Sequence, residues 1–371
     1  MAGERSYEDV FGKFDRPEKL EGLSAGYERM GDGNVGAYHT YDEVVDELKA
    51  KEGSHADIMS VSDIGTTHEG RPIKVARITA NRKKIKGKKP EVLFMGQTHA
   101  REYISAEVAL GIIKTLTDGY GKDKNITRLV DERDFYIVPV VNPDGSMKVA
   151  KELAEKGDSA WRKNTRDNNG DGKINYQDGV DLNRNFDSPE WGSRRGSSSV
   201  PSSETYRGPS AFSEPETAAI RDLAKSHHFS VSISYHSYSN LILYPLGHTA
   251  NPTKDDPLFR KLGEKMQALQ AHEKYTLQRS YDLYPTVGDS DSWLYESAGV
   301  IPFTFEVYSG GKEGGVFQAF NPPENEIKYH VDNNVPAALY LASVADNPAK
   351  VLKNSTKAPS KPTSYYAKAS L

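Results

Sequence analysis

The chain has 371 residues, of which 36% are hydrophobic and 27% charged, the usual composition of a globular protein. Its 48 Lys and Arg nearly balance 52 Asp and Glu, so bulk charge favours neither a nucleic-acid partner nor a membrane surface. There is no cysteine, which excludes disulfides, thiolate metal sites and a cysteine nucleophile. A metal would have to be held by histidine, carboxylates, carbonyls or water.

The chain divides into an arm, one domain and a tail. Residues 1–35 are polar and Gly-rich, and they lack the apolar segment of a signal peptide, so we expect an N-terminal arm or leader remnant. We expect one domain over 36–345 and a tail over 346–371. No run of about 18 apolar residues occurs that would predict a membrane span.

The domain begins with a helix and two strands. Thr40 and Glu43 have the spacing of a capping box and predict a helix start. Strands are expected at 58–64 and 73–79, and the basic segment 81–90 is expected to be a solvated loop.

The stretch 91–102 joins a strand to a helix. The apolar run 92–95 predicts a buried strand, and apolar residues at helical spacing follow from 103. His99 and Glu102 lie between the two elements, where open α/β sheets bind ligands. By spacing alone, a helix-capping role for this pair is the better interpretation, ahead of metal binding.

Further elements alternate in type. A strand at 135–141 precedes a turn at 142–145, the Ser/Gly/Pro-rich stretch 188–210 predicts a long loop, and a capping box at 213–216 predicts another helix. A strand within 231–247 carries His236, and one at 301–308 carries Glu306. Helices are expected at 255–274, 289–298 and 331–344. We therefore predict a single-domain α/β fold: a mixed, mostly parallel sheet of about eight strands with helices on both faces.

Eight short motifs occur in a fixed order along this domain. They are His99-Ala100-Arg101-Glu102, Asn142-Pro143-Asp144-Gly145, Trp161-Arg162-Lys163-Asn164, Asp181-Leu182-Asn183-Arg184-Asn185-Phe186, Ser203-Glu204-Thr205-Tyr206-Arg207-Gly208-Pro209, Tyr235-His236-Ser237-Tyr238, Asp282-Leu283-Tyr284 and Phe303-Thr304-Phe305-Glu306. Together they resemble the zinc metallocarboxypeptidases of the carboxypeptidase A/B family, over roughly residues 38–345. The chain is similar to the broad-specificity bacterial members of this family.

The resemblance implies one catalytic Zn²⁺ and a hydrolase acting on peptide bonds. It makes His99, Glu102 and His236 the zinc ligands, a ligand set that fits a catalytic zinc with an open water position. It makes Glu306 the general base and acid, and Arg162 the group that polarises the scissile carbonyl. The remaining residues that it assigns to substrate binding are Asn183, Arg184 and Tyr284 for the terminal carboxylate, and Arg101, Ser237 and Tyr238 further out.

The resemblance also points to a side-chain pocket with acidic residues. Asp291 stands two residues before Trp293, where an acidic residue goes with C-terminal Lys or Arg, and Asp289 adds a second carboxylate. We therefore expect release of single C-terminal residues, with basic-preferring or dual specificity. Arg279 could neutralise one of the two carboxylates, and plain helix-surface roles for both are the alternative.

The segment 167–178 matches an EF-hand-type calcium loop. Oxygen ligands would be Asp167, Asn169 and Asp171, with Asp178 in the closing position where the pattern favours a longer Glu. A Ca²⁺ bound there would stiffen the segment between Arg162 and Arg184. An ordinary Asn/Asp/Gly turn is the alternative.

Three readings of function remain at this point. The first is a carboxypeptidase acting on peptide or protein C-termini, expected to be monomeric and secreted, with neither nucleic acid nor membrane as partner. The second is a cell-wall peptide carboxypeptidase of the same superfamily. The third is a non-catalytic carboxypeptidase-like binding domain, which would be expected to have lost a ligand or the base, whereas Glu306 and the other key residues are all present.

Overall fold

The computed structural model describes residues 35–80, 89–193, 195–312 and 314–353. The predicted loop at 81–90 lies largely outside the described residues, as do most of the predicted arm and tail. One eight-stranded sheet runs through the structure in the order β1-β2-β4-β3-β5-β8-β6-β7. Its strands are β1 (Met59–Thr66), β2 (Pro72–Ile78), β3 (Glu91–Met95), β4 (Asp134–Val138), β5 (Phe229–His236), β6 (Leu241–Tyr244), β7 (Thr276–Arg279) and β8 (Ile301–Glu306).

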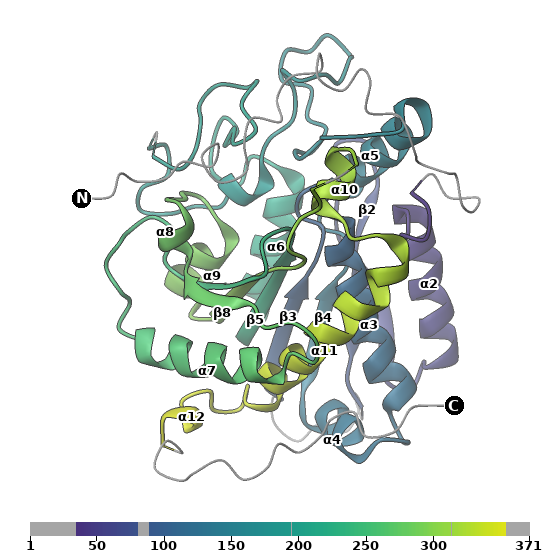
Figure 1. The fold of residues 1–371 in the computed structure, drawn as a ribbon, viewed down its shortest axis with the longest axis vertical. Helices are drawn as coiled ribbons and strands as arrows, with labels where there is room; N and C mark the ends of the chain where they lie inside the picture. The colour runs from purple at the N-terminus through teal and green to yellow at the C-terminus, as the bar shows by residue number, and fades with distance from the viewer. Residues whose placement is uncertain (1–34, 81–88, 194, 313, 354–371) are drawn as a thin grey trace.

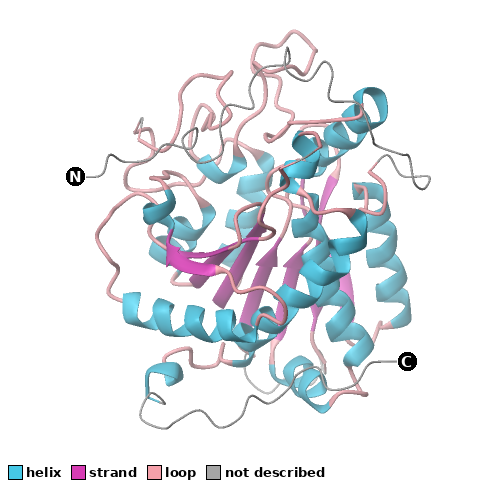
Figure 2. Cartoon of the chain, in the orientation of Figure 1, coloured by secondary structure: helices cyan, strands magenta, loops and turns pink. Residues whose placement is uncertain are grey.

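The sheet is mixed, as predicted. The four central strands β4, β3, β5 and β8 are parallel. Antiparallel pairing joins β1 to β2, β2 to β4 and β6 to β8, while β6 and β7 are parallel. Helices cover both faces of this sheet (Figure 1 and Figure 2). They are α2 (Tyr41–Ser54), α3 (Tyr103–Gly119), α4 (Lys124–Glu132), α5 (Pro143–Lys156), α6 (Pro215–Ser226), α7 (Asp256–Leu269), α8 (Ser280–Leu283), α9 (Ser290–Ala298), α10 (Val316–Phe320), α11 (Ile327–Ser343), α12 (Lys350–Lys353) and the 3₁₀ turns η2 (Leu182–Arg184) and η3 (Glu324–Glu326).

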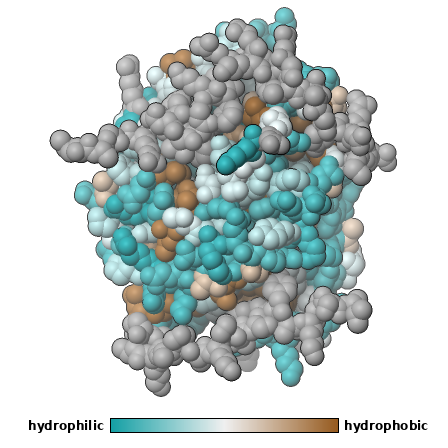
Figure 3. Space-filling model, viewed as in Figure 1, coloured by the Kyte–Doolittle hydropathy of each residue, from teal (hydrophilic) through white to brown (hydrophobic). Residues whose placement is uncertain are grey.

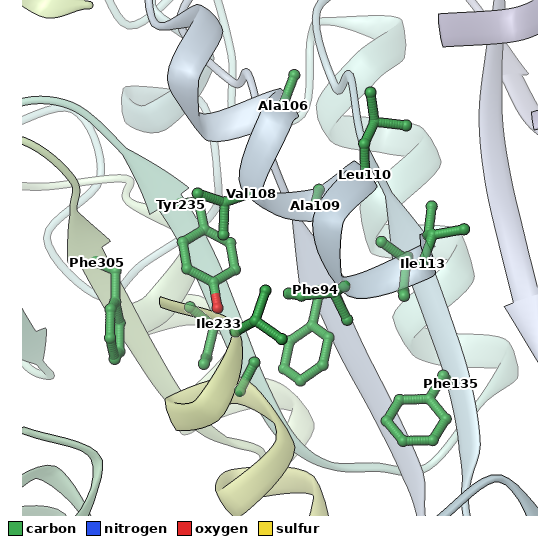
Figure 4. Packing of buried hydrophobic residues seen from close by; sticks show 14 of the residues in the cluster. Phe94, Ala106, Val108, Ala109, Leu110, Ile113, Phe135, Ile233, Tyr235 and Phe305 are labelled. Atoms are coloured by element: carbon green, nitrogen blue, oxygen red, sulfur yellow. The ribbon is translucent and has the colours of Figure 1, made fainter. Parts of the chain in front are cut away.

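The central strands are buried on both faces because their side chains alternate between two cores. In β3, Val92 and Phe94 point into the larger core, which α2, α3, α7 and α11 cover, and Leu93 and Met95 point into the smaller one beneath α6 and α9. Figure 4 shows the larger core at close range, where Val108 and Ala109 of α3 lie above Phe94 and Ile233. The apolar run in the sequence thus reflects burial on two sides.

Several predicted elements differ from those in the structure. The turn at 142–145 is the start of α5: Asn142 is its N-cap, accepting a hydrogen bond from the Gly145 N–H, and Pro143 is the first helical residue. The strand before it ends at Val138. The predicted strand region 231–247 contains two strands, β5 and β6. They run in opposite directions because the chain reverses at 237–240.

The two predicted capping boxes have different outcomes. At α2 the Thr40 side chain accepts from the Glu43 N–H, and the Glu43 carboxylate accepts from the Thr40 N–H, as predicted. At α6 the prediction of a Ser213–Glu216 box is wrong, because Glu214 is the N-cap and makes no side-chain cap hydrogen bond. The Ser213 hydroxyl instead donates to Glu214 Oε1 at 2.7 Å.

The described part of the predicted tail packs on the domain. In the short helix α12, Val351 is 7% exposed and joins the larger core, and α12 contacts α7. Among the described helices, none is long and apolar enough to cross a membrane. Figure 3 shows a mainly hydrophilic face with scattered apolar patches around the grey atoms.

The strand order places a switch point between β3 and β5. From β3 the chain crosses to β4 on one side, and later it returns to β5 on the other side. Loops leaving the carboxyl ends of β3 and β5 therefore diverge and leave a crevice, which is where open α/β sheets bind ligands.

Candidate active site

Three predicted metal ligands meet at this crevice. His99 follows β3, Glu102 is the N-cap residue of α3, and His236 is the last residue of β5. Nδ1 of His99 lies 2.8 Å from Glu102 Oε1, Nδ1 of His236 lies 3.0 Å from Glu102 Oε2, and the two Nδ1 atoms are 3.1 Å apart. All three side chains are buried, so the helix-capping interpretation of the pair is not what the structure shows: Glu102 makes no side-chain cap hydrogen bond.

The donor chemistry of this cluster fits a cation. His99 Nε2 lies 3.3 Å from Asp181 Oδ1, and His236 Nε2 lies 3.0 Å from the Ser234 hydroxyl. With the proton of each ring on Nε2, both Nδ1 atoms present lone pairs towards each other and towards the Glu102 carboxylate. Three buried acceptors that face one another need a positive charge between them. Two imidazoles and a carboxylate are the ligand types that zinc prefers.

Glu306 lies beside this cluster because of strand register. It is the last residue of β8, and its Cα pairs with that of His236 across the parallel β5–β8 ladder. Burial, reinforced by the charge of Glu102, raises the pKa of Glu306 well above its usual range, against the opposing charges of Arg162 and Arg184. A carboxyl placed beside the metal ligands can accept and donate protons where a metal-bound water would lie.

Asp181 connects several parts of the site, and sequence reasoning assigned it no role. Its Oδ2 accepts from Nε and Nη2 of Arg162, at 3.0 Å each, and its Oδ1 faces His99. Its Oδ1 also accepts from the Asn183 N–H, which caps the turn η2. Burial alone would raise the pKa of Asp181, but Arg162 and Arg184 hold it well below its usual range.

One cleft contains most of the predicted substrate residues. Arg184 and Tyr284 both line it and contact each other: Arg184 Nη2 lies 3.4 Å from the Tyr284 hydroxyl. Its wall is formed by His99, Glu102, Arg162, Asn183, Arg184, Ser237, Leu243, Ser280, Leu283, Tyr284, Thr286, Asp289, Thr304, Glu306 and Phe320. Leu243, Thr286, Thr304 and Phe320 also line the cleft, although the sequence analysis assigned none of them a role.

Arg101, Tyr238 and Asp291 lie just behind this wall. The Arg101 guanidinium stacks 4.1 Å from the ring centroid of Phe320 and donates to Glu204 Oε2 at 3.0 Å. The Tyr238 ring packs edge-on against Phe320, with centroids 5.0 Å apart. Phe320 thus connects these two predicted residues to the cleft.

The two pocket carboxyls have different surroundings. Asp289 is the N-cap of α9 and lines the cleft, whereas Asp291, in the first turn of the same helix, is buried behind Thr304. The suggestion that Arg279 neutralises one of them is wrong, because its guanidinium pairs with Asp282 at 2.8 Å on the surface.

The segment 167–178 forms a series of Asx turns. Asp167 accepts from the N–H groups of Gly170 and Gly172, and Asp171 accepts from that of Lys173. Both oxygens of the buried Asp178 accept backbone hydrogen bonds, from Asn168 and Asn175. Within the described ranges, no three acidic or histidine ligand atoms of this loop lie within 4.8 Å of one another.

A second His/Glu cluster, away from the cleft, is already balanced by protein groups. His68 Nε2 lies 2.9 Å from Glu214 Oε2, and Glu216 is buried beside it. The Asn164 amide donates to both carboxylates, at 2.8 Å and 3.2 Å, and Arg166 donates to Glu214 Oε1 at 3.1 Å. This network ties the β1–β2 turn to α6 and to the segment that carries Arg162.

Comparison with known proteins identifies the class. The zinc carboxypeptidase family matches residues 44–337. Carboxypeptidase A4 of Mus musculus is 30% identical over 84% of this chain and 72% of its own length. The zinc carboxypeptidase of Saccharothrix mutabilis subsp. capreolus is 32% identical, over 83% and 70%. Carboxypeptidase B2 of Rattus norvegicus is 32% identical, over 86% and 71%.

The fold agrees with this match. The crystal structure of thrombin activatable fibrinolysis inhibitor superposes with a TM-score of 0.72 at 28% identity, covering 92% of this chain and 81% of that one. The chain belongs to the zinc carboxypeptidase family, and it is a metallocarboxypeptidase that acts on peptide C-termini. Relatives named for both the A and the B type occur at similar identity, so family membership leaves the side-chain preference open.

Proposed function

We propose that this metallocarboxypeptidase releases single C-terminal residues and accepts basic as well as apolar side chains. The observation that carries the proposal is the composition of one cleft: His99 and Glu102, which cluster with His236, line it together with the guanidinium groups of Arg162 and Arg184 and with Asp289. An exopeptidase must recognise a free carboxylate beside the scissile bond, and Arg is the side chain suited to that task.

The catalytic roles follow from position and charge. Zinc, when held by His99, Glu102 and His236, supplies Lewis-acid activation of a water molecule and of the scissile carbonyl. Glu306 takes a proton from the attacking water and passes it to the leaving amine. Arg162, oriented by Asp181, stabilises the negative charge that develops on the carbonyl oxygen.

The substrate's terminal carboxylate would be bound by Asn183, Arg184 and Tyr284. Arg184 is 1% exposed and stacks 5.8 Å from the Tyr284 ring centroid, so its guanidinium is already oriented before substrate arrives. Ser237 lines the cleft. Arg101 and Tyr238 pack against Phe320 and would shape the side of the cleft that faces the preceding substrate residues.

A peptide and its C-terminal amide test the exopeptidase proposal. Zinc-loaded protein should release the last residue from the free acid at least about 100-fold faster than from the amide, because the amide cannot pair with Arg184. Removal of zinc with a chelator should abolish release, and added Zn²⁺ should restore it. Equal cleavage of acid and amide would contradict the proposal.

The side-chain preference is tested with peptides that differ only in their last residue. Lys and Leu should both be released faster than Glu, because Asp289 and Asp291 disfavour a third carboxylate in the pocket. Faster release of Glu than of Lys would refute basic or dual specificity.

We also propose that the 167–178 loop binds calcium and that the protein is secreted, and neither proposal depends on the exopeptidase function. Asp167, Asn169 and Asp171 carry side-chain oxygens in a tight loop, and a cation would have to draw Asp178 away from its two backbone donors. The calcium prediction requires a higher melting temperature in Ca²⁺ than in a chelator that spares zinc. Secretion requires the protein in the medium of its source cells.

A further inference from the structure

The carboxylate of Asp158 joins two segments that lie far apart in the sequence. Asp158 is 6% exposed and belongs to the stretch of chain that leads from α5 to Arg162. Its Oδ2 accepts from the Val316 N–H and its Oδ1 from the Phe317 N–H, at 2.8 Å each. These are the first two residues of α10, and the first N–H groups of a helix have no partner within the helix. The carboxylate of Asp158 therefore fixes the start of α10.

The approach of α10 to this carboxylate is close. Gly315 is the N-cap of α10, and a Cβ added to it would lie 2.5 Å from Asp158 Oδ2 and Cγ. Its φ of −84° and ψ of −173° are open to other residue types, so the backbone conformation does not require glycine. An alanine at Gly315 would therefore act by crowding the Asp158 carboxylate.

The other end of α10 is fixed to the segment that carries a metal ligand. Asn321, the C-cap of α10, is 1% exposed. Its side-chain amide donates to the Arg101 carbonyl at 2.8 Å, and its Oδ1 accepts from the Ile104 N–H at 3.0 Å. Arg101 and Ile104 stand on either side of Glu102 in the chain. Asp158 and Asn321 thus hold the two ends of α10 beside the metal-ligand cluster.

The last residue of α10, Phe320, lines the cleft. The half-buried Tyr238 packs edge-on against it, and we call these two rings the aromatic pair. The Arg101 guanidinium, next to the ligand Glu102 in the chain, stacks on the Phe320 ring. A substrate whose terminal carboxylate is bound by Arg184 must lead its preceding residues past the metal ligands. The aromatic pair is the apolar surface that adjoins those ligands.

We propose that Asp158 is a positioning residue: by fixing α10, it holds the aromatic pair against the substrate side chain that precedes the scissile bond. The proposal rests on the proposed exopeptidase function and deepens it, because it names a residue that sets the preference on the acyl side of that bond. An apolar side chain gains from burial against two rings, whereas a methyl group gains little. The enzyme therefore prefers a large apolar residue before the scissile bond.

The test is the ratio of kcat/KM for two N-blocked dipeptides that end in the same Leu, one with Phe and one with Ala before the scissile bond. Both peptides use the same metal, the same proton transfer by Glu306 and the same carboxylate clamp, so the ratio isolates the preceding residue. In the wild-type enzyme the Phe peptide should be favoured by about tenfold or more.

Two substitutions disturb the contact from opposite sides. Asp158→Ala removes the acceptors, and Gly315→Ala crowds them. Each should lower the ratio at least about threefold, through a higher KM for the Phe peptide, and should change kcat for the Ala peptide less than about twofold. Phe320→Ala should lower the ratio at least as much, and adding Asp158→Ala to it should lower the ratio no further, because the two residues act as one unit.

The matched control is Asp123→Ala. Asp123 is the N-cap of α4, and its Oδ1 accepts from the N–H groups of Asn125 and Ile126 at 2.7 Å and 3.0 Å. The described residues that line the cleft include none from α4. This variant should melt below wild type and keep the wild-type ratio. A lowered ratio in Asp123→Ala would assign the effect to general destabilisation and overturn the proposal.

Equal kcat/KM for the two peptides in the wild-type enzyme would overturn the role of Asp158 and leave the exopeptidase function intact. A fall in kcat shared equally by both peptides in Asp158→Ala would also overturn it, because Asp158 would then act on Arg162. Zinc content and melting temperature show which variants are folded, and Gly315→Ala decides the question if Asp158→Ala does not fold. Failure to cleave any peptide would remove the proposed function and this role together.

Discussion

The active site depends on Asp181, a residue that would not bind the metal itself but that orients the groups around it. Asp181 touches the ring of His99 and the guanidinium of Arg162, and it caps the turn that carries Asn183 and Arg184. One carboxylate thus orients a proposed zinc ligand, the oxyanion group and the carboxylate clamp. Its pKa lies well below its usual range, so it stays ionised at any working pH.

The substitution Asp181→Asn tests whether the negative charge of this side chain, apart from its size, orients the site. The amide keeps the size of the side chain but loses the charge that Arg162 and His99 face, so we expect zinc affinity and kcat/KM each to fall about 10–100-fold. Metal-buffered titration and peptide kinetics measure the two effects. Wild-type zinc affinity in this variant would mean that Asp181 does not orient His99.

Glu306→Gln should remove proton transfer while leaving the metal cluster intact. We expect kcat to fall about 100- to 10,000-fold, because glutamine can neither take a proton from water nor donate one to the amine. The KM should change little, since Asn183 and Arg184 are untouched. Zinc content equal to wild type is the control, and retained turnover would contradict the assigned role.

The sequence predicted the candidate metal ligands better than it predicted the other residues around them. His99, Glu102 and His236 were predicted as metal ligands from the ordered motifs and the family that they resemble, since the spacing of His99 and Glu102 alone favoured a helix cap. The structure brings the three side chains together. Thr304 and Phe320 were not predictable as cleft residues, because the sequence does not show where the fold will place a hydroxyl or an aromatic ring.

At the scale of elements, local patterns predicted helices where a single face is apolar, and failed where tertiary contacts decide. The capping box at Thr40 formed because both partners are free to meet, whereas Ser213 was drawn to Glu214. The helices α4 and α5 went unpredicted. In α5, Asn142-Pro143 also reads as a turn, and only the helical residues that follow distinguish the two.

The packing of α3 on α11 depends on one glycine. A Cβ added at Gly111 would lie 2.3 Å from Val331 Cγ1, so an alanine there would force the Val331 side chain out of its present position. We expect Gly111→Ala to lower the free energy of unfolding by about 1–3 kcal/mol, through overpacking. Thermal unfolding of the zinc-loaded protein measures this.

Gly53 in α2 supplies the matched control. A Cβ at this position meets nothing within 4 Å, so Gly53→Ala should leave the protein as stable as wild type or more stable by about 0.5–1 kcal/mol. If both substitutions had the same effect, the close approach of α3 and α11 would not explain the glycine.

For the whole molecule, the switch point of the sheet determines where the active site lies, and ionisable groups away from that site contribute to the pH dependence of stability. The fold class was predictable from the alternation of strands and helices, whereas the strand order was not, because it depends on which long-range crossovers close the sheet. Long-range ionic contacts were equally invisible in the sequence: His39 joins Glu107 of α3, and His68 joins Glu214 of α6.

Glu216 makes alkaline pH unfavourable for the fold. Burial, reinforced by the charge of Glu214, raises its pKa from 4.5 to about 8. A carboxyl whose pKa is raised by folding stabilises the native state fully below its unfolded value, and that contribution is lost as pH rises through about 8. His39, raised to about 10 by Glu107 and Glu47, loses its contribution only at higher pH.

Glu216→Gln should therefore become relatively more stable as pH rises. The amide keeps an acceptor for Asn164 but cannot ionise, so at about pH 9 we expect it to melt roughly 3–10 °C above wild type, with a much smaller offset at about pH 5. Glu155→Gln, at an exposed position of α5, is the control and should show no offset that depends on pH. Scanning calorimetry at both pH values measures the difference. An equal offset at both pH values would mean that Glu216 is ionised in the folded protein throughout this range, and that the Glu214–Arg166–Asn164 network around it tolerates a second buried charge.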